Sequence, residues 1–277
     1  MKLPAVVRGQ FYPDRREDLR KLFKSFESLP AAQLSGEPLG LLLPYAGYPY
    51  SGALAALGYR SLPKDLETIV VAGPSHYVRF QGISLFAGEA VETPWGDLPV
   101  DQESCRFLLD QTDAFLEFEP AFAREHSVEV HFPLIRKYCP NARVVPLVMG
   151  QGKSFSVEPL VAALHALRRQ KPFLLVASSD LSHYPSYETA VAADRRFLSA
   201  LISGDEERIE SVDREILAEN HPDYFCTHCG PEPHSALTRW AKLEKAQKIQ
   251  LLSYRNSGDV TGDHSRVVGY AAAAFCK

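Results

Sequence analysis

The amino-acid sequence predicts an α/β protein in which a single domain spans residues 1–277 and a central mixed β-sheet is flanked by helices. Three observations support this fold class. Short apolar runs alternate with amphipathic stretches over the whole length, no Gly/Ser linker or internal repeat divides the chain, and 277 residues suit one large domain.

Six apolar runs are predicted to be buried strands. Val, Ile and Leu follow one another in them without polar alternation, which is typical of strands covered on both faces of a sheet. Several of these runs end at a Gly, Pro or Ser turn. The predicted strands are 41–43, 67–72, 143–149, 173–177, 249–254 and 267–275.

Helical patterns lie between the predicted strands. In the first of them Leu19, Leu22, Phe23 and Phe26 recur at the three- and four-residue spacing of one helix face. The predicted helices are 16–26, 51–57, 157–168, 187–202 and 233–243, with a shorter piece at 207–210.

The composition narrows the class of protein. Hydrophobic residues make up 45% of the chain and charged residues 23%, with a net charge of −4, and the basic residues form no face that would suit a nucleic acid. No apolar run approaches the roughly 20 residues of a membrane-spanning helix, and the N-terminus has no apolar segment of signal-peptide length. The five cysteines are odd in number and mostly far apart, which indicates reduced thiols and a cytoplasmic protein.

Polar and aromatic side chains gather on four tight turns, most of them just after an apolar run. In open α/β sheets the carboxyl ends of strands border the crevice where ligands bind, so these turns are the best candidates for a functional site. The turns are 43–48, 72–77, 178–183 and 226–231.

Two of these turns carry metal-ligand side chains. His76 is either a metal ligand or acid/base group, or a residue that hydrogen-bonds within its turn. Cys226-x-x-Cys229 lacks the second Cys pair of a typical structural zinc site. A redox dithiol and a pair of buried free thiols remain as alternative interpretations. We favour a third one, in which Cys229 alone contributes a ligand to a composite site.

The segment 125–131 concentrates two His and two Glu. Ser127 is expected to cap a helix whose first turn contains Glu129, which leaves His126 and His131 unexplained. We expect at least one of the His and Glu side chains to point into the site.

The turn 178–183 has a carboxylate three residues before an imidazole. Asp180 either orients His183 or another ring, or caps the following helix.

Taken together and in this order, the motifs resemble the Memo family over nearly the whole chain. Any one motif is common, but the ordered set is specific. The matching segments are 7–13 (VRGQFYP), 44–52 (PYAGYPYSG), 73–76 (GPSH), 125–131 (EHSVEVH), 178–183 (SSDLSH) and 229–230 (CG).

This resemblance implies a fold similar to the class III extradiol dioxygenases and a pocket with one transition metal, Fe, Cu or Zn. Its metal-ligand positions fall on His76 and Cys229, with Tyr45 at the position where the family typically has His. Because a phenol must ionise to bind a metal well and has a reference pKa of about 10, Tyr45 weakens the expected site. Asp180 and His183 match the pocket positions that we assign as catalytic. The residues expected to contact substrate are Tyr45, Tyr48, Ser75, His126, Glu129 and His131.

Two classes of function follow. The first is a metal-dependent oxidoreductase, favoured over a Cys-His hydrolase that would use Cys229 and His183. The second is a non-catalytic protein whose pocket, with aromatic walls supplied by Tyr45, Tyr48, Tyr50 and Tyr77, binds a small molecule or peptide. The resemblance implies AMMECR-type and radical-SAM proteins as partners, as in the AmmeMemoRadiSam system, and neither class involves nucleic acid or a membrane.

Overall fold

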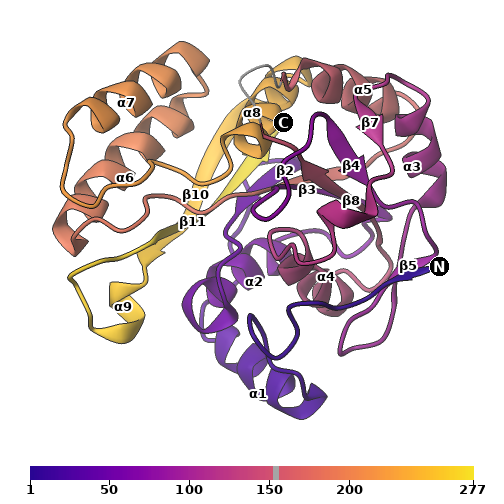
Figure 1. Ribbon diagram of the computed structural model, residues 1–277, viewed down its shortest axis with the longest axis horizontal. Helices are drawn as coiled ribbons and strands as arrows, with labels where there is room; N and C mark the ends of the chain where they lie inside the picture. Colours follow the sequence, from indigo (N-terminus) through magenta and orange to yellow (C-terminus); the bar gives the residue numbers. More distant parts are fainter. Residues whose placement is uncertain (152–155) are drawn as a thin grey trace.

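A computed structural model describes residues 1–151 and 156–277 (Figure 1). Its main feature is an eight-stranded mixed sheet. Four parallel strands in the order β2-β9-β3-β8 form its centre, and antiparallel pairs extend it on both sides. In spatial order the strands are β10 (Lys248–Asn256), β11 (Gly269–Cys276), β2 (Pro38–Leu43), β9 (Leu174–Ser178), β3 (Thr68–Pro74), β8 (Arg143–Met149), β4 (Ile83–Leu85) and β7 (Phe115–Leu116).

Helices cover both faces of this sheet (Figure 1). One face carries α1 (Arg16–Phe26), α2 (Ala53–Arg60) and α4 (Phe132–Tyr138), and the other carries α3 (Gln102–Leu109), α5 (Glu158–Arg168) and α8 (Pro231–Leu243). The close approach of α8 to β2 requires Gly40, where a Cβ atom would lie 2.5 Å from the Leu237 side chain.

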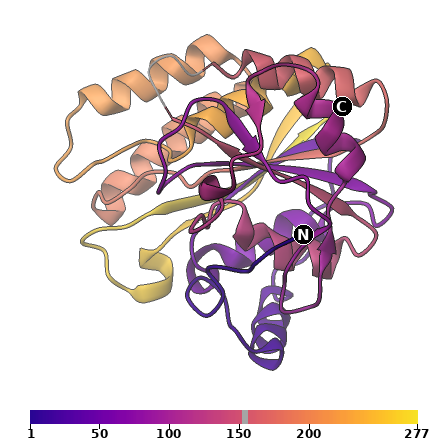
Figure 2. The ribbon, with the colours of Figure 1, turned by 45° about the vertical axis from the view of Figure 1, so that its right-hand side comes forward.

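The remaining elements extend this layered arrangement. Helices α6 (Tyr187–Ser203) and α7 (Glu206–Ala218) pack together beside β10, at the left of Figures 1 and 2, and α9 (Gly258–Thr261) lies between β10 and β11. A small sheet joins β1 (Lys2–Leu3), β5 (Ala90–Val91) and β6 (Leu98–Pro99). Short turns of helix occur at Tyr48–Gly52, Glu119–Ala121 and Glu129–His131.

The predicted fold class is confirmed: the structure is a mixed α/β domain with a large central sheet flanked by helices. Each predicted strand and helix has a counterpart in it. Helix α7 runs from Glu206 to Ala218 and is thus much longer than the predicted piece at 207–210; Asp205 caps its N-terminus by accepting a hydrogen bond from the backbone N–H of Arg208. The short elements α3, α4, β4 and β7 were not predicted, since their apolar patterns cover too few residues.

The prediction that Ser127 caps a helix is wrong. Its hydroxyl instead donates to the Pro74 carbonyl at 2.8 Å, and the helix α4 starts five residues later, at Phe132. This bond ties the segment after residue 125 to the end of β3.

Within the described residues, no helix is long and apolar enough to cross a membrane.

Asp194 on α6 is a buried carboxyl that joins three parts of the fold. Its oxygens accept hydrogen bonds from the Ser182 backbone at 3.2 Å and from the Tyr254 hydroxyl at 2.8 Å. Burial raises its pKa to about 7, against the opposing effect of these hydrogen bonds.

This raised pKa predicts that the stability of the protein depends on pH. Between about pH 4 and 7, Asp194 retains a proton in the folded protein that it has released in the unfolded chain. The contribution of Asp194 to the free energy of unfolding is therefore largest in acid and is lost as pH rises through 7. The difference between a pKa of 3.8 and one of about 7 corresponds to about 4 kcal/mol at most. Asp194→Asn should therefore flatten this slope, measured as the urea unfolding free energy at pH 5 and pH 8. The exposed Asp110→Asn is the matched control, and equal slopes in all three proteins would contradict the assignment.

Candidate functional site

A pocket of about 700 Å³ opens where the carboxyl ends of β2, β9 and β3 meet the loop before α8. The turns after β2 and β3 supply Tyr45 and His76, the turn after β9 supplies Asp180 and His183, and the loop supplies Cys229. The structure therefore brings these five residues from the predicted polar turns together in one pocket. Other residues that line the pocket are Phe11, Tyr50, His126, Tyr184, Phe225, Asp263, Arg266 and Tyr270.

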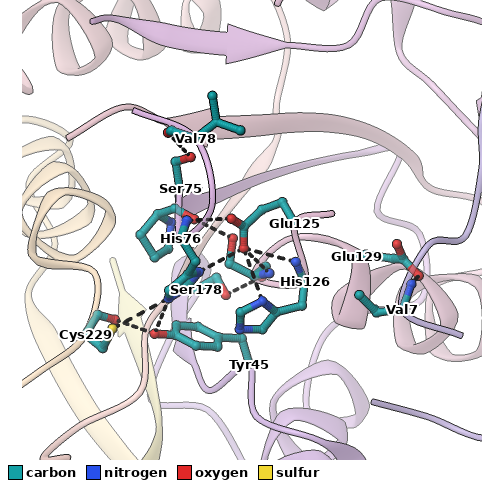
Figure 3. A network of polar contacts seen from close by, with 12 residues as sticks. Val7, Tyr45, Ser75, His76, Val78, Glu125, His126, Glu129, Ser178 and Cys229 are labelled. Atoms are coloured by element: carbon teal, nitrogen blue, oxygen red, sulfur yellow. Dashed lines mark hydrogen bonds and ion pairs between the residues drawn. The ribbon is translucent and has the colours of Figure 1, made fainter. Parts of the chain in front are cut away.

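Glu125 holds the centre of the site in place (Figure 3). One of its oxygens accepts from the His76 backbone at 2.6 Å, and the other accepts from the His76 ring Nδ1 at 2.9 Å and from the backbone of His126 and Ser127. Burial would raise the pKa of Glu125, but these hydrogen bonds outweigh it and lower the pKa below its usual value. The ionised carboxylate accepts the Nδ1 proton and so leaves the opposite ring nitrogen, Nε2, facing the pocket.

Two other side chains approach the Nε2 atom of His76. The Tyr45 hydroxyl lies 3.1 Å away and the Cys229 sulfur 3.6 Å away. The Tyr45 hydroxyl also donates to the Cys229 carbonyl at 3.3 Å, so it can accept from His76 at the same time. Burial lowers the pKa of His76, but the hydrogen bonds to Cys229 and Glu125 outweigh it and raise the pKa to about 10.

Cys229 carries the negative charge that faces His76. The Cys226 thiol hydrogen-bonds to its sulfur, and this bond, with further ones from His76 and Tyr45, lowers the pKa of Cys229 despite its burial. The same contact with Cys229, followed by burial, raises the pKa of Cys226. Cys229 also lies two residues before Pro231, where α8 begins, and the partial positive charge of a helix N-terminus favours a thiolate.

Three rings form a stack along one wall of the pocket. Phe11 stacks on His126 with ring centroids 4.4 Å apart, and His126 stacks on His76 at 4.5 Å. Burial and the neighbouring charge of His76 lower the pKa of His126 to about 4, so its imidazole is neutral. Its Nδ1 atom is buried without a hydrogen-bond partner and lies 3.4 Å from a Glu125 oxygen.

Asp180 has neither of the two roles that its position in the sequence predicted. Its carboxylate accepts from the Tyr45 backbone at 2.9 Å, while α6 is capped by Ser186 and the His183 Nδ1 atom bonds to the Leu181 carbonyl. Burial raises the pKa of Asp180 to about 8, although the hydrogen bond from Tyr45 opposes this effect.

His183 lines the pocket with one of its two ring nitrogens held by the backbone. Because a carbonyl oxygen only accepts hydrogen bonds, the Nδ1 atom of His183 must carry the proton in the 2.9 Å bond to Leu181. In the neutral imidazole the Nε2 atom is then the nitrogen without a proton. The imidazole in contact with the Cys229 sulfur is His76, so the hydrolase hypothesis loses its pairing of Cys229 with His183.

Four residues predicted to contact substrate do not line the pocket. Tyr48 is buried and donates to the Val130 carbonyl, and Ser75 donates to the Val78 carbonyl. His131 is fully buried between Tyr59 and Ser178, and burial lowers its pKa to about 3.

The fourth of these residues, Glu129, binds the N-terminal segment, away from His76 in Figure 3. It accepts hydrogen bonds from the backbone of Val6 and Val7 and from the Tyr12 hydroxyl, at 2.7 to 3.0 Å. Of the two predicted His and two Glu in 125–131, His126 is the one that lines the pocket.

His228 and His234, which flank Cys229, do not join the site. They pack against Phe197, with ring centroids 4.7 and 5.4 Å from it, and line a separate cavity of about 220 Å³.

Among the residues that the structure describes, His76, Glu125 and His126 form a group that could hold a metal ion, because their ligand atoms lie within 4.8 Å of one another. Glu125 was not among the predicted site residues, and neither were Phe11 or Arg266. The sequence did place Glu125 and Phe11 inside motifs, but only the folded chain shows that they face His76 and His126.

Comparisons with known proteins agree on one family. The model of the family described as Memo-like protein matches residues 4–274. A MEMO1 family protein of Thermoplasma acidophilum is 32% identical over 274 residues, covering 98% of both chains. Another, from Methanothermobacter thermautotrophicus, is 34% identical over 282 residues and covers 98% of this chain and 99% of its own.

A solved structure supports the fold. An uncharacterized protein of Escherichia coli K12 aligns with a TM-score of 0.52 at 15% sequence identity, covering 85% of this chain and 98% of that one. At this identity the likeness concerns the fold alone, and the predicted similarity to extradiol dioxygenases stays a prediction.

Replacing Glu125 tests the origin of the charge on His76. Glu125→Gln should lower the pKa of His76 from about 10 and reduce the unfolding free energy by about 1–3 kcal/mol, because buried N–H groups lose an ionised acceptor. The pKa is measured by NMR titration of the imidazole Cε1–H signal in chelator-treated protein. The exposed Glu119→Gln serves as control, and an unchanged His76 titration in Glu125→Gln would refute the role of the carboxylate.

Proposed function

Because the chain belongs to the Memo family, we propose that its strand-end pocket binds one transition-metal ion, Fe, Cu or Zn, and acts with it on a small molecule as a redox or metal-assisted enzyme. One observation carries this proposal: the Nε2 atom of His76 faces the Cys229 sulfur at 3.6 Å while a buried carboxylate holds its other nitrogen. An imidazole nitrogen and a thiolate sulfur are donors for these metals, and a carboxylate behind the His is a common support for a metal site.

The third ligand is better supplied by His126 than by Tyr45. Burial and the nearby charge of Asp180 raise the pKa of Tyr45 well above 10, so its phenol stays protonated and serves as a hydrogen-bond donor. His126 is neutral and has an unpartnered Nδ1 atom. With His126 as the third ligand, the pocket would regain part of the metal affinity that a Tyr at the usual ligand position costs.

Glu125 fits the role of an orienting group better than that of a ligand. Both of its oxygens already accept short hydrogen bonds from the backbone, and one also accepts from the His76 ring. Metal binding to Glu125 would break hydrogen bonds that hold two chain segments together, whereas binding to the pocket-facing Nε2 atom of His76 keeps them.

The bound ion would supply Lewis-acid or electron-transfer chemistry. His183 would move a proton through its Nε2 atom, because Nδ1 is held by Leu181. Asp180, whose pKa is raised to about 8 and which lines the pocket, can keep a proton near neutral pH close to Tyr45. The aromatic walls would orient the substrate and exclude water.

A second candidate function is binding without catalysis. The mouth of the pocket is lined by Tyr50, Tyr184 and Phe225, which are 38%, 43% and 73% exposed. Exposed aromatic side chains are enriched where proteins bind partners or ligands, so this rim favours a peptide or protein surface. The AMMECR-type and radical-SAM proteins expected from the family are the partners we propose for it.

Metal titration tests the first proposal. Anaerobic calorimetry with Fe²⁺, Cu⁺ and Zn²⁺ should show one tight site, which His76→Ala and Cys229→Ser abolish and Glu125→Gln weakens about 10–100-fold. Because metal must displace the Nε2 proton of His76, whose pKa is raised to about 10, affinity should rise with pH. His165→Ala on α5, a His paired with Glu244, is the matched control. Binding that survives in both ligand variants would contradict the proposal.

Co-purification tests the second proposal. The chain should capture AMMECR-type and radical-SAM proteins co-expressed from the same genome, and Phe225→Ala should reduce that capture because it removes the most exposed ring of the rim. Leu217→Ala, which removes an exposed apolar side chain on α7, is the control. No stable complex with the unaltered chain would count against binding as its function.

A further inference from the structure

We propose that Cys226 and Cys229 form a redox-active dithiol that reduces small hydroperoxides and closes to a disulfide in doing so. This activity goes beyond the metal-assisted function, because it uses only side chains of this chain and needs no bound ion. It rests on the contact between the two sulfurs, on the backbone that holds them and on their different access to the pocket.

The two thiols are neighbours, since the Cys226 thiol hydrogen-bonds to the Cys229 sulfur. The chain bends between them at Thr227. Both side chains therefore lie on one short loop, where a disulfide can close once their Cα atoms come within the separation that it spans.

The backbone on both sides of the pair is fixed. The Cys226 carbonyl accepts from the His183 backbone at 3.2 Å, and the Cys229 backbone donates to the Asp180 carbonyl at 3.0 Å. Both partners belong to the turn that follows β9. The dithiol is therefore anchored to the central sheet, and not carried on a free loop.

The two cysteines differ in how they meet the pocket. Cys229 lines it, with its sulfur against His76, whereas Cys226 is half-buried and is not among the lining residues. Cys229 is thus the sulfur that an incoming small molecule meets, and Cys226 is placed to attack it afterwards. The other cysteines, Cys105, Cys139 and Cys276, are at most 1% exposed.

The reaction balances with a hydroperoxide as the oxidant. The Cys229 thiolate attacks the terminal oxygen, the O–O bond breaks, and a proton from the Nε2 atom of the facing His76 ring goes to the leaving oxygen, which departs as an alcohol or water. This leaves a sulfenic acid on Cys229. The Cys226 sulfur then attacks the oxidised sulfur, an S–S bond forms, and the hydroxyl group leaves as water with the Cys226 proton. The two cysteines are oxidised by two electrons and the hydroperoxide is reduced by two.

The surroundings of Cys229 suit this step. His76 Nε2 and the Tyr45 hydroxyl are polar groups next to the sulfur, and they can donate hydrogen bonds to the departing oxygen. The pocket volume of about 700 Å³ admits a small organic hydroperoxide as well as hydrogen peroxide.

The disulfide and a metal bound at Cys229 exclude each other, because a disulfide sulfur is no longer a thiolate ligand. The test therefore uses chelator-treated, reduced full-length protein, so that its outcome does not depend on whether the metal proposal holds. One equivalent of hydrogen peroxide or of cumene hydroperoxide is added, and the tryptic peptide 215–239, which contains both cysteines, is analysed by mass spectrometry.

We expect this peptide to lose the mass of two hydrogen atoms and dithiothreitol to restore it. Cys226→Ser should stop at a sulfenic acid on Cys229 that dimedone traps, and Cys229→Ser should show neither product. Cys139→Ser, which removes a buried thiol elsewhere, is the matched control and should behave like the unaltered protein. An unchanged 215–239 peptide in the unaltered protein would overturn the proposal. So would the same products in Cys229→Ser as in the unaltered chain.

Discussion

The site depends on one buried carboxylate. Glu125 binds the backbone and the ring of His76, and the same side chain accepts from the backbone of His126 and Ser127. It therefore joins the end of β3 to a segment about fifty residues further along the chain. Without the ionised Glu125 carboxylate, the two imidazoles would lose the contacts that position them. The buried N–H groups would also lose the negative charge that compensates for their burial.

A second carboxyl, Asp180, supports the opposite side of the pocket under different electrostatics. Hydrogen bonds from His76 and the backbone keep Glu125 ionised, whereas deeper burial raises the pKa of Asp180 to about 8. Two buried acids on opposite sides of the pocket thus differ in protonation near neutral pH. Because of this difference, Glu125 can hold the cationic ring of His76 in place while Asp180 can hold a transferable proton.

The sequence predicted what depends on local pattern. Strands such as β3 and β8 were found because their apolar residues are contiguous, and His76 and Asp180 converge because the turns after parallel strands share one edge. It did not predict contacts between distant segments. Ser127 looked like a helix cap because its bond to the Pro74 carbonyl, 53 residues away, leaves no local trace. For the same reason the pairing of Glu125 with His76 was visible only after folding.

The clamp that Glu129 places on Val6, Val7 and Tyr12 has a consequence for how the chain matures. These contacts join residues 117 to 123 positions apart, so the segment 6–12 must wait until more than a hundred later residues have been made before it can dock on Glu129. Phe11 lies in that same segment and covers His126. Phe11 can therefore cover His126 only after Glu129 has been made, and this wall of the pocket joins two segments that are synthesised at different times.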